Sequence, residues 1–300
     1  MPAALLFSIV IPTYGRPRQL AACLQAIAQL RYPRERFEAI VVDDGSGLSL
    51  DPAVDPVRDR VDVTLLRQPH AGAAAARNTG AAGAGGRLVA FTDDDCAPAE
   101  DWLGKLEARF AGAPDAMIGG RTVNALTANP YAMASQLVVD AGFAHLNGDP
   151  ERARFFTASN LALPLDGFRA VGGFDASFVT SEDRELCGRW EARGGRLIFA
   201  PEALVRHAHE LTFGGFWRQH FHYGRGAFLM QQARARHGWS QFRPDPSYYL
   251  RLLRHPFGRA PRTRAVQLSA LLLLAQSASA TGLVAEWLRS RRARARGRAA

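Results

Sequence analysis

The feature that most restricts the fold is a set of short apolar segments in the first third of the chain, each leading into a polar cluster or a turn. These segments are rich in β-branched and aliphatic residues and lie at residues 7–14, 37–46, 61–68 and 87–95. Uninterrupted apolar runs of this length are typical of strands buried on both faces, as in a parallel sheet. The segments 16–30 and 71–86 between them predict helices. The chain therefore predicts an α/β fold with a mostly parallel central sheet covered by helices.

Polar side chains follow three of the predicted strands at the point where each strand ends. They are Thr13 and Tyr14 after the first strand, Asp43 and Asp44 after the second, and the aspartates at 93–95 after the fourth. In open α/β sheets the ligand crevice lies beyond the carboxyl ends of the strands. We therefore expect these clusters to meet at one edge of the sheet, although they are far apart in the sequence.

The triplet Asp93, Asp94 and Asp95 is the first candidate site. Adjacent carboxylates repel each other, so a folded chain keeps such a cluster where a cation, a ligand or solvent compensates it. Carboxylate oxygens are ligands that suit Mg²⁺ or Mn²⁺. A solvated acidic turn would also explain the triplet, but its position at a strand end favours a cation site.

Two further candidates in this half of the chain have plain structural explanations. Asp44 follows a buried strand and could accept a hydrogen bond from a ribose or a base, yet Asp-Gly-Ser is also an ordinary turn sequence. Arg77 lies in a helix of small residues, where it would pair with phosphate or form a surface ion pair. The sequence contains neither a G-x-G-x-x-G nor a Walker A motif.

The second half of the chain offers acids and histidines. Residues 181–195 predict a helix with Ser181 as N-cap and with Glu182 and Asp183 in its first turn. The helix dipole keeps a carboxylate at this position ionised, which suits a general base, although simple capping is the commoner explanation. Residues 196–209 predict a strand that carries two histidines, His207 and His209.

Taken together, the motifs resemble those of glycosyltransferase family 2. In order they are SIVIPTYGRP, VVDDGS, GAAAARNTGAAGAGGRLVAFTDDD, GGFD, SEDRELCGRWEARGGRLIFAP and VRHAH, which span residues 7 to 210. The resemblance implies the GT-A fold, a nucleotide-binding α/β sandwich with an acceptor-binding half. It also implies transfer of a sugar from a nucleotide-sugar with inversion at the anomeric carbon.

The resemblance assigns roles to individual positions of this sequence. The residues expected to contact the nucleotide-sugar are Pro12, Thr13, Tyr14, Asp44, Arg77, Asp93 and Asp94. Asp95 is expected to hold Mg²⁺ or Mn²⁺, and His207 to provide a further metal or pyrophosphate contact. Asp183 is expected to be the catalytic base, with Glu182 as the alternative if the register differs by one residue.

The resemblance divides the first part of the chain into a nucleotide-sugar half, residues 1–120, and an acceptor and catalytic-base half, residues 121–230. The composition of residues 231–300 predicts a basic helical tail that could associate with a membrane. That tail holds 14 arginines but 2 acids, whereas the whole chain has 37 basic and 28 acidic residues, so the net charge of +9 is a property of the tail. Its uncharged run, 265–285, is long enough to cross a bilayer but contains several polar residues.

Four alternatives stay open: the run spans a membrane, it lies on an anionic membrane surface, it packs on the protein, or the tail is a disordered basic end without a partner. The three cysteines of the chain are not in a metal-ligand spacing, which favours a reducing compartment. We therefore expect a cytoplasmic protein at the inner face of the cell membrane, without a nucleic-acid partner.

The predicted activity is that of a metal-dependent inverting glycosyltransferase, which moves a sugar to a hydroxyl of a glycan or lipid-linked acceptor such as a cell-envelope polysaccharide. A single displacement needs one base, and we find no second carboxylate placed as a nucleophile for a retaining path. The alternative enzyme class is a Mg²⁺-dependent phosphohydrolase that uses Asp93 as its nucleophile. A third hypothesis is a non-catalytic, arginine-tailed binding protein. The donor and the acceptor are not readable from the sequence.

Overall fold

The computed structural model describes residues 4–239, 245–258 and 260–297, which form two compact units. Unit 1 consists of Met1–Ala125, Leu146–Ser177 and Glu182–Ala208, and unit 2 of Leu126–His145, Phe178–Ser181 and His209–Ala300. The chain passes repeatedly from one unit to the other, whereas the division expected from the sequence runs at residues 120 and 230. Residues 240–244, 259 and 298–300 of the expected tail lie outside the described residues.

Unit 1 contains a sheet of eight described strands in the order β3-β2-β1-β4-β7-β6-β8-β5. The strands are β1 (Phe7–Thr13), β2 (Phe37–Asp43), β3 (Val63–Arg67), β4 (Leu88–Phe91), β5 (Cys96–Pro98), β6 (Met117–Asn124), β7 (Leu161–Pro164) and β8 (Leu197–His207). The first four pair in parallel, so the parallel sheet expected from the apolar runs is confirmed. β7 is antiparallel to both of its neighbours, β8 is parallel to β6, and β5 is antiparallel to β8.

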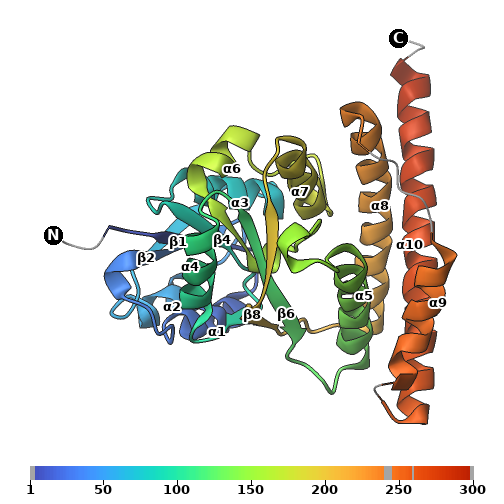
Figure 1. Ribbon diagram of the computed structural model, residues 1–300, viewed down its shortest axis with the longest axis horizontal. Coiled ribbons are helices and arrows are strands. Elements are labelled where there is room, and N and C mark those ends of the chain that lie inside the picture. The colour runs from blue at the N-terminus through green and yellow to red at the C-terminus, as the bar shows by residue number, and fades with distance from the viewer. Residues whose placement is uncertain (1–3, 240–244, 259, 298–300) are drawn as a thin grey trace. The chain divides into compact units, whose positions relative to one another are not determined.

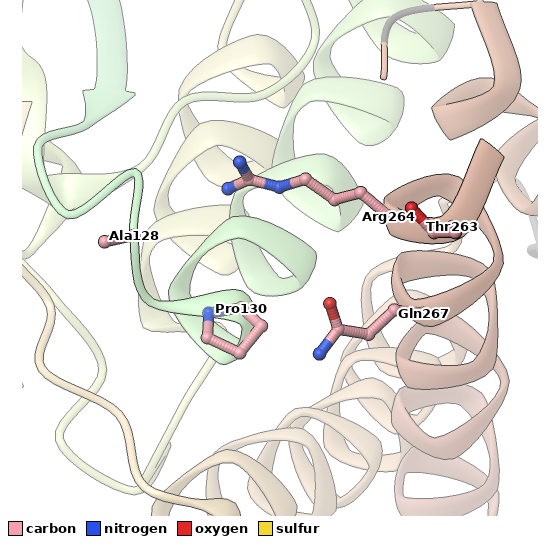
Figure 2. Close-up of a pocket in the computed structure, with 5 residues that line it drawn as sticks. All are labelled: Ala128, Pro130, Thr263, Arg264 and Gln267. Carbon is pink, nitrogen blue, oxygen red and sulfur yellow. The ribbon is translucent and has the colours of Figure 1, made fainter. Parts of the chain in front are cut away.

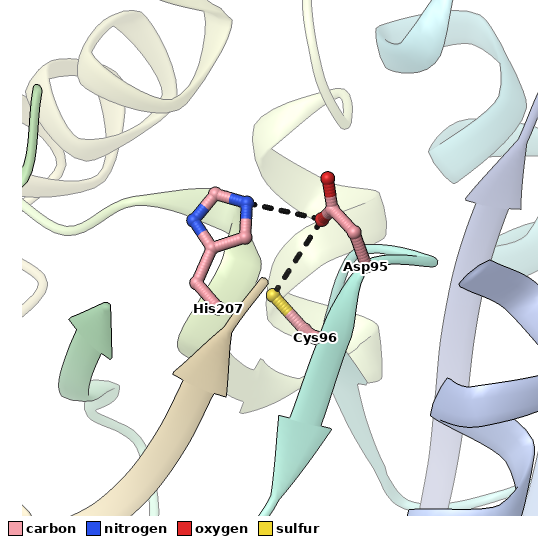
Figure 3. A group of neighbouring side chains, drawn as sticks. All are labelled: Asp95, Cys96 and His207. Carbon is pink, nitrogen blue, oxygen red and sulfur yellow. Dashed lines mark hydrogen bonds and ion pairs between the residues drawn. The ribbon is translucent and has the colours of Figure 1, made fainter. Parts of the chain in front are cut away.

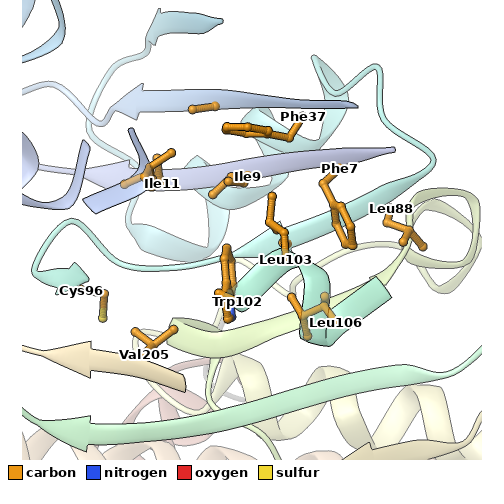
Figure 4. Packing of buried hydrophobic residues seen from close by; sticks show 14 of the residues in the cluster. Phe7, Ile9, Ile11, Phe37, Leu88, Cys96, Trp102, Leu103, Leu106 and Val205 are labelled. Carbon is orange, nitrogen blue, oxygen red and sulfur yellow. The ribbon is translucent and has the colours of Figure 1, made fainter. Parts of the chain in front are cut away.

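Helices cover both faces of this sheet. One face packs against α1 (Pro17–Ile27), α2 (Asp51–Val54) and α4 (Trp102–Gly112). Figure 4 shows this core, in which Phe7, Ile9 and Ile11 of β1 meet Trp102 and Leu103 of α4. The alternation along β1 places successive side chains on opposite faces, so both faces of the strand are buried.

The other face of the sheet packs against α3 (Ala73–Ala82) and α6 (Leu165–Val171). A Cβ added at Gly80 of α3 would lie 2.4 Å from Cγ1 of Val10, so this helix lies almost directly on β1. The small residues that suggested a helix at 71–86 therefore have a packing role as well, because larger side chains would push α3 off the sheet.

The two helices α5 (Pro130–Leu146) and α6 were not expected from the sequence. The region around α6 is rich in glycines and aromatic residues and shows no helical period in the sequence. α6 ends at Gly172, which has a φ of 92° and closes the helix in the left-handed conformation. The predicted helix at 181–195 is confirmed as α7 (Glu182–Ala192).

Unit 2 is helical and contains α8 (Phe213–His237), α9 (Pro246–Arg254) and α10 (Arg262–Gly297) beside α5. α8 and α10 run side by side (Figure 1) and touch through glycines. A Cβ at Gly224 would lie 1.8 Å from the carbonyl oxygen of Ser279, and one at Gly282 would lie 1.9 Å from that of Phe221. The two backbones are thus in direct contact.

The uncharged run 265–285 forms the middle of α10. Its inner face packs into the core of unit 2 through Leu268, Leu272 and Ala275. The outer face of α10 exposes Leu273 and Val284 within this run, and Trp287 and Leu288 beyond it. Among the described helices, α10 is the one long and apolar enough to cross a membrane, by length and composition alone.

Candidate active site

The carboxyl ends of β1, β2 and β4 bring the predicted polar clusters to one edge of the sheet. Thr13 is the register partner of Asp43, and the amide of Asp44 donates to the carbonyl of Thr13 at 2.9 Å. The amide of Thr92 donates to the carbonyl of Val10 at 3.2 Å, which aligns the start of the aspartate triplet with β1. The convergence expected from the sequence is therefore confirmed for these three strand ends.

Arg16 compensates two of the three aspartates and was not identified from the sequence. Its Nη1 lies 2.8 Å from Oδ2 of Asp95, its Nε lies 3.2 Å from Oδ2 of Asp94, and its Nη2 pairs with Oδ1 of Asp94. Gly15 has a φ of 66°, a conformation that glycine adopts easily, and it reverses the chain just before Arg16. One signal was present in the sequence, since an arginine directly follows the first strand-end cluster.

Asp94 has no exposed surface, and both of its oxygens are engaged. The hydroxyl of Thr13 donates to Oδ2 at 2.7 Å, and Arg16 binds both oxygens. Burial raises the pKa of Asp94 to about 6, although Arg16 and Thr13 favour the ionised form. Asp94 therefore links the end of β1 to the triplet, and both of its oxygens are already engaged by Thr13 and Arg16.

Asp95, Cys96 and His207 form the group that could hold a metal ion (Figure 3). Because β5 pairs with β8 in the register Cys96 to His207, Nε2 of His207 lies 3.0 Å from Oδ1 of Asp95. Burial lowers the pKa of His207, but the hydrogen bond and charge of Asp95 outweigh it, so that the pKa is raised. Burial raises the pKa of Cys96 well above its usual value and keeps a thiol there.

The donor set of this group fits Mg²⁺ or Mn²⁺ through Asp95 and His207. Adjacent ligands of an octahedral ion, with bonds of about 2.1 Å, are about 3.0 Å apart, which matches the separation of the two atoms. A protonated, buried thiol is a poor ligand for such a hard ion, so Cys96 is better described as packing than as a ligand.

Arg77 links the aspartate triplet to the first turn of α7. Its Nη2 lies 2.7 Å from Oδ1 of Asp93 and its Nη1 lies 2.8 Å from Oε1 of Glu182. The guanidinium is buried and lies over the ring of Phe174 at 5.5 Å. The sequence left phosphate binding and a surface ion pair open for Arg77, and the structure instead places it in a buried bridge between two acids.

Asp183 follows Glu182 in the first turn of α7, but its contacts differ from those of Glu182. Its Oδ1 accepts a hydrogen bond of 2.7 Å from the amide of Arg184. Burial, together with the charge of Glu182, raises the pKa of Asp183 to about 7. Burial therefore outweighs the helix dipole, which was expected to keep this carboxylate ionised. The preceding Ser181 has a φ of 70°, unlike the extended conformation usual for an N-cap residue.

Asp44 is buried, and its carboxylate organises the loop that follows β3. Its Oδ1 accepts from Gln68 Nε2 and from the amide of Ala71, and its Oδ2 accepts from the amide of Gly72. Nδ1 of His70 lies 2.9 Å from the same Oδ2. These four partners match the four lone-pair sites of a carboxylate, so Asp44 holds the loop in place.

Tyr14 is exposed and faces His70, with the ring centroids 4.3 Å apart and the planes 31° apart. The two rings form an accessible aromatic surface beside Asp44, whereas Pro12 is buried. β8 ends at His207, so that His209 lies beyond the strand on which the sequence placed it, and belongs to unit 2.

A separate hollow lies within unit 2, beside the start of α10 (Figure 2). It is lined by Ala128, Pro130, Thr263, Arg264 and Gln267. Arg264 donates to the carbonyl of Thr127, and the lining contains no acid or thiol. This hollow therefore lacks the groups that general acid–base chemistry needs.

Known proteins with similar sequences are glycosyltransferases. Pre-mycofactocin glycosyltransferase of Mycobacterium tuberculosis is 32% identical over 225 residues, which cover 73% of this chain and 46% of that protein. Validoxylamine A glucosyltransferase of Streptomyces hygroscopicus is 29% identical over 238 residues, which cover 69% of this chain and 56% of that protein. The chain thus spans about half the length of these relatives.

The fold is shared with a solved glycosyltransferase structure. The mannosyltransferase PcManGT of Pyrobaculum calidifontis, solved with GDP-Man and Mn²⁺, has a TM-score of 0.63 and 20% identity over 98% of this chain and 81% of its own. The family model described as Glycosyl transferase family 2 matches residues 8–174, more than half of the chain. The chain therefore belongs to glycosyl transferase family 2 and has the GT-A fold.

Proposed function

We propose that the protein is an inverting, metal-dependent glycosyltransferase that moves a sugar from a nucleoside-diphosphate sugar to an acceptor hydroxyl. The observation that carries the proposal is the Arg77 bridge, because it joins the acids expected to bind the donor to the acids expected to activate the acceptor. Both groups lie in unit 1, and the bridge fixes the start of α7 next to the triplet.

The donor would lie along the strand-end edge. Tyr14 and His70 offer their rings to a nucleobase, since aromatic surfaces bind the faces of planar rings. Asp95 and His207 would hold the divalent cation, which would act as a Lewis acid that stabilises the diphosphate leaving group. PcManGT, which has the same fold, supports this placement because it was solved with GDP-Man and Mn²⁺.

Asp183 would act as the general base. A base with a pKa near the operating pH is most effective, and the raised pKa of Asp183 meets that condition. Glu182 is bound to Arg77 and would have to break this ion pair to accept a proton. One base and one displacement give inversion, whereas retention needs a second carboxylate as nucleophile.

The acceptor would be a hydroxyl of a glycan or of a lipid-linked glycan at the inner face of the membrane. The support is the outer face of α10, where exposed apolar residues are followed by Arg289, Arg291 and Arg292. An apolar face together with a basic cluster is a combination that binds anionic membrane surfaces. Sedimentation with vesicles of phosphatidylglycerol, compared with phosphatidylcholine, tests this part of the proposal.

The phosphohydrolase alternative is not supported. A nucleophilic aspartate would have to attack phosphorus, but Oδ1 of Asp93 accepts a short hydrogen bond from the buried Arg77. The family match covers the triplet as well, and it indicates a sugar transferase. A phosphohydrolase would also leave the aromatic surface and the Glu182–Asp183 pair without a role.

The experiment that tests the proposed function is a hydrolysis screen of nucleotide-sugars. The purified protein is incubated with UDP-, GDP- and dTDP-sugars, with Mn²⁺, with Mg²⁺ and with EDTA, and the release of nucleoside diphosphate is measured. We expect at least one donor to be turned over with a divalent cation and none with EDTA. Failure to bind or turn over any donor under all conditions would contradict the proposal.

A further inference from the structure

Arg16 covers Asp95, which the proposed function assigns to the metal, together with the neighbouring Asp94. Its side chain is 41% exposed, whereas those of Asp94 and Asp95 are 0% and 5% exposed. All three guanidinium nitrogens contact the two carboxylates. A ligand that approaches the pair from solvent therefore meets the guanidinium first.

The two oxygens of Asp95 have different cationic partners. Oδ2 pairs with Nη1 of Arg16 at 2.8 Å, and Oδ1 lies 3.0 Å from Nε2 of His207, where a divalent ion would bind. A metal and a guanidinium on one carboxylate repel each other, because like charges at such short range interact strongly in a poorly solvated site. In the free protein Arg16 therefore opposes the binding of a metal.

A diphosphate changes this balance. The negative charge of its oxygens would compensate the repulsion between the metal and Arg16. A guanidinium group also binds phosphate oxygens in pairs. On these grounds we propose that Arg16 couples the binding of the divalent cation to the binding of the donor diphosphate. When no diphosphate is bound, Arg16 replaces the metal as the counter-ion of the acids. When the diphosphate is bound, Arg16 becomes a second contact to it. The inference rests on the proposed function.

The coupling has two measurable sides. Binding linkage is reciprocal, so the factor by which a nucleoside diphosphate tightens Mn²⁺ binding equals the factor by which Mn²⁺ tightens nucleotide binding. Couplings of this kind are roughly 5–150-fold. Removing Arg16 should therefore change metal binding and nucleotide binding in opposite directions, which general damage to the fold would not do.

The test compares Arg16→Gln with the wild type and with Arg18→Gln as a control. Arg18 is exposed on α1, so its loss removes the same charge without touching the acids. Binding of Mn²⁺ alone is measured from the electron paramagnetic resonance signal of the free ion. Binding of UDP, GDP and dTDP is measured by calorimetry in EDTA and again with Mn²⁺.

We expect Arg16→Gln to bind Mn²⁺ alone about tenfold more tightly and its nucleotide in EDTA about tenfold more weakly. Arg18→Gln should match the wild type in both measurements. Arg16→Lys retains the charge but not the fork, so its Mn²⁺ affinity should stay near that of the wild type while nucleotide binding weakens. Thermal unfolding of each variant confirms that the fold is intact.

The inference is overturned if Arg16→Gln binds Mn²⁺ no more tightly than the wild type, or if both affinities fall together. If Arg16→Gln shows neither change while the wild type turns over a donor with Mn²⁺, the inference alone fails. If both changes appear but no donor is ever turned over, the coupling stands and the proposed transferase activity fails. If neither the wild type nor the variants bind Mn²⁺ with any nucleotide, both fail.

Discussion

The site has two groups of adjacent acids, the aspartate triplet and the first turn of α7. They differ in how their carboxylates are compensated. In the triplet, Asp93 pairs with Arg77, Asp94 with Arg16, and Asp95 with Arg16 and His207. In the first turn of α7, Arg77 binds Glu182, whereas the pKa of Asp183 is raised to about 7.

This difference separates two tasks. Carboxylates that hold a cation must be ionised, and each acid of the triplet has a cationic partner in the free protein. A carboxylate that accepts a proton needs a higher affinity for it, which burial beside another acid provides. Asp94 is the exception in its group, because complete burial raises its pKa to about 6. Its contacts with Thr13 and Arg16 give it a structural role.

Among variants of the aspartate triplet, we expect the largest effect on transfer for Asp95→Asn. The change removes a charged metal ligand and one partner of Arg16, so transfer should fall roughly 10²–10³-fold and Mn²⁺ should no longer stimulate it. Transfer rates measured across a Mn²⁺ titration check this. Full Mn²⁺ stimulation of the variant would show that the metal binds elsewhere.

The raised pKa of Asp183 predicts the pH dependence of transfer. Asp183 must be ionised to accept a proton, so kcat/KM should rise about tenfold per pH unit up to an inflection near pH 7, and then level off. The measurement is a profile between pH 5 and 9 at saturating Mn²⁺. A profile that is flat from pH 5 upward would mean that the base has an ordinary carboxyl pKa. It would contradict the proposed difference between the triplet and Asp183.

The same pKa predicts an effect on stability. Between the ordinary carboxyl pKa of 3.8 and about 7, the folded state binds more protons at Asp183 than the unfolded state does, so the free energy of unfolding falls as pH rises. Asp183→Asn removes this cost and should stabilise the protein at pH 8, by up to about 4 kcal/mol for a shift of this size, with little change at pH 4. Urea unfolding at both pH values is the measurement. Destabilisation of the variant at pH 8 would mean that the ionised carboxylate is stabilised by its surroundings.

The smallest effect on transfer is expected for Glu182→Gln. The variant loses one ion pair of Arg77 but keeps the proposed base, so transfer should fall about tenfold or less, below the range for loss of a base. Removal of the neighbouring charge should also shift the inflection of the pH profile to lower pH. A loss of transfer as large as that of Asp183→Asn would make Glu182 the base.

Much of the parallel half of the fold could be predicted from the sequence. β1, β2 and β4 are short, mostly apolar runs rich in β-branched residues, and both their length and their composition favour strands over helices. α5 could not be predicted in this way, because its segment is apolar on nearly every side and lacks a clear helical period. α6 could not be predicted either, because it is short and lies among aromatic residues and glycines that give no helical pattern.

The side-chain bridges of the site were beyond a single sequence. Arg16 lies 78 residues from Asp94, and Arg77 lies 105 residues from Glu182. An arginine can pair with any acid that the fold brings near, so sequence spacing alone does not name the partner. The acids of the triplet were found because they follow a strand, and Glu182 and Asp183 because they open a helix, and both positions are visible in the sequence.

The measurement that tests the account most directly is the comparison of donor binding and sugar transfer in Asp183→Asn. If Asp183 is the base and the donor is held by the strand-end edge, the variant should bind the nucleotide-sugar with Mn²⁺ within about twofold of the wild type. Its transfer rate should fall by about 10²–10⁴-fold. Equal loss of binding and transfer, or transfer at the wild-type rate, would contradict the assignment of the two acidic groups to separate tasks.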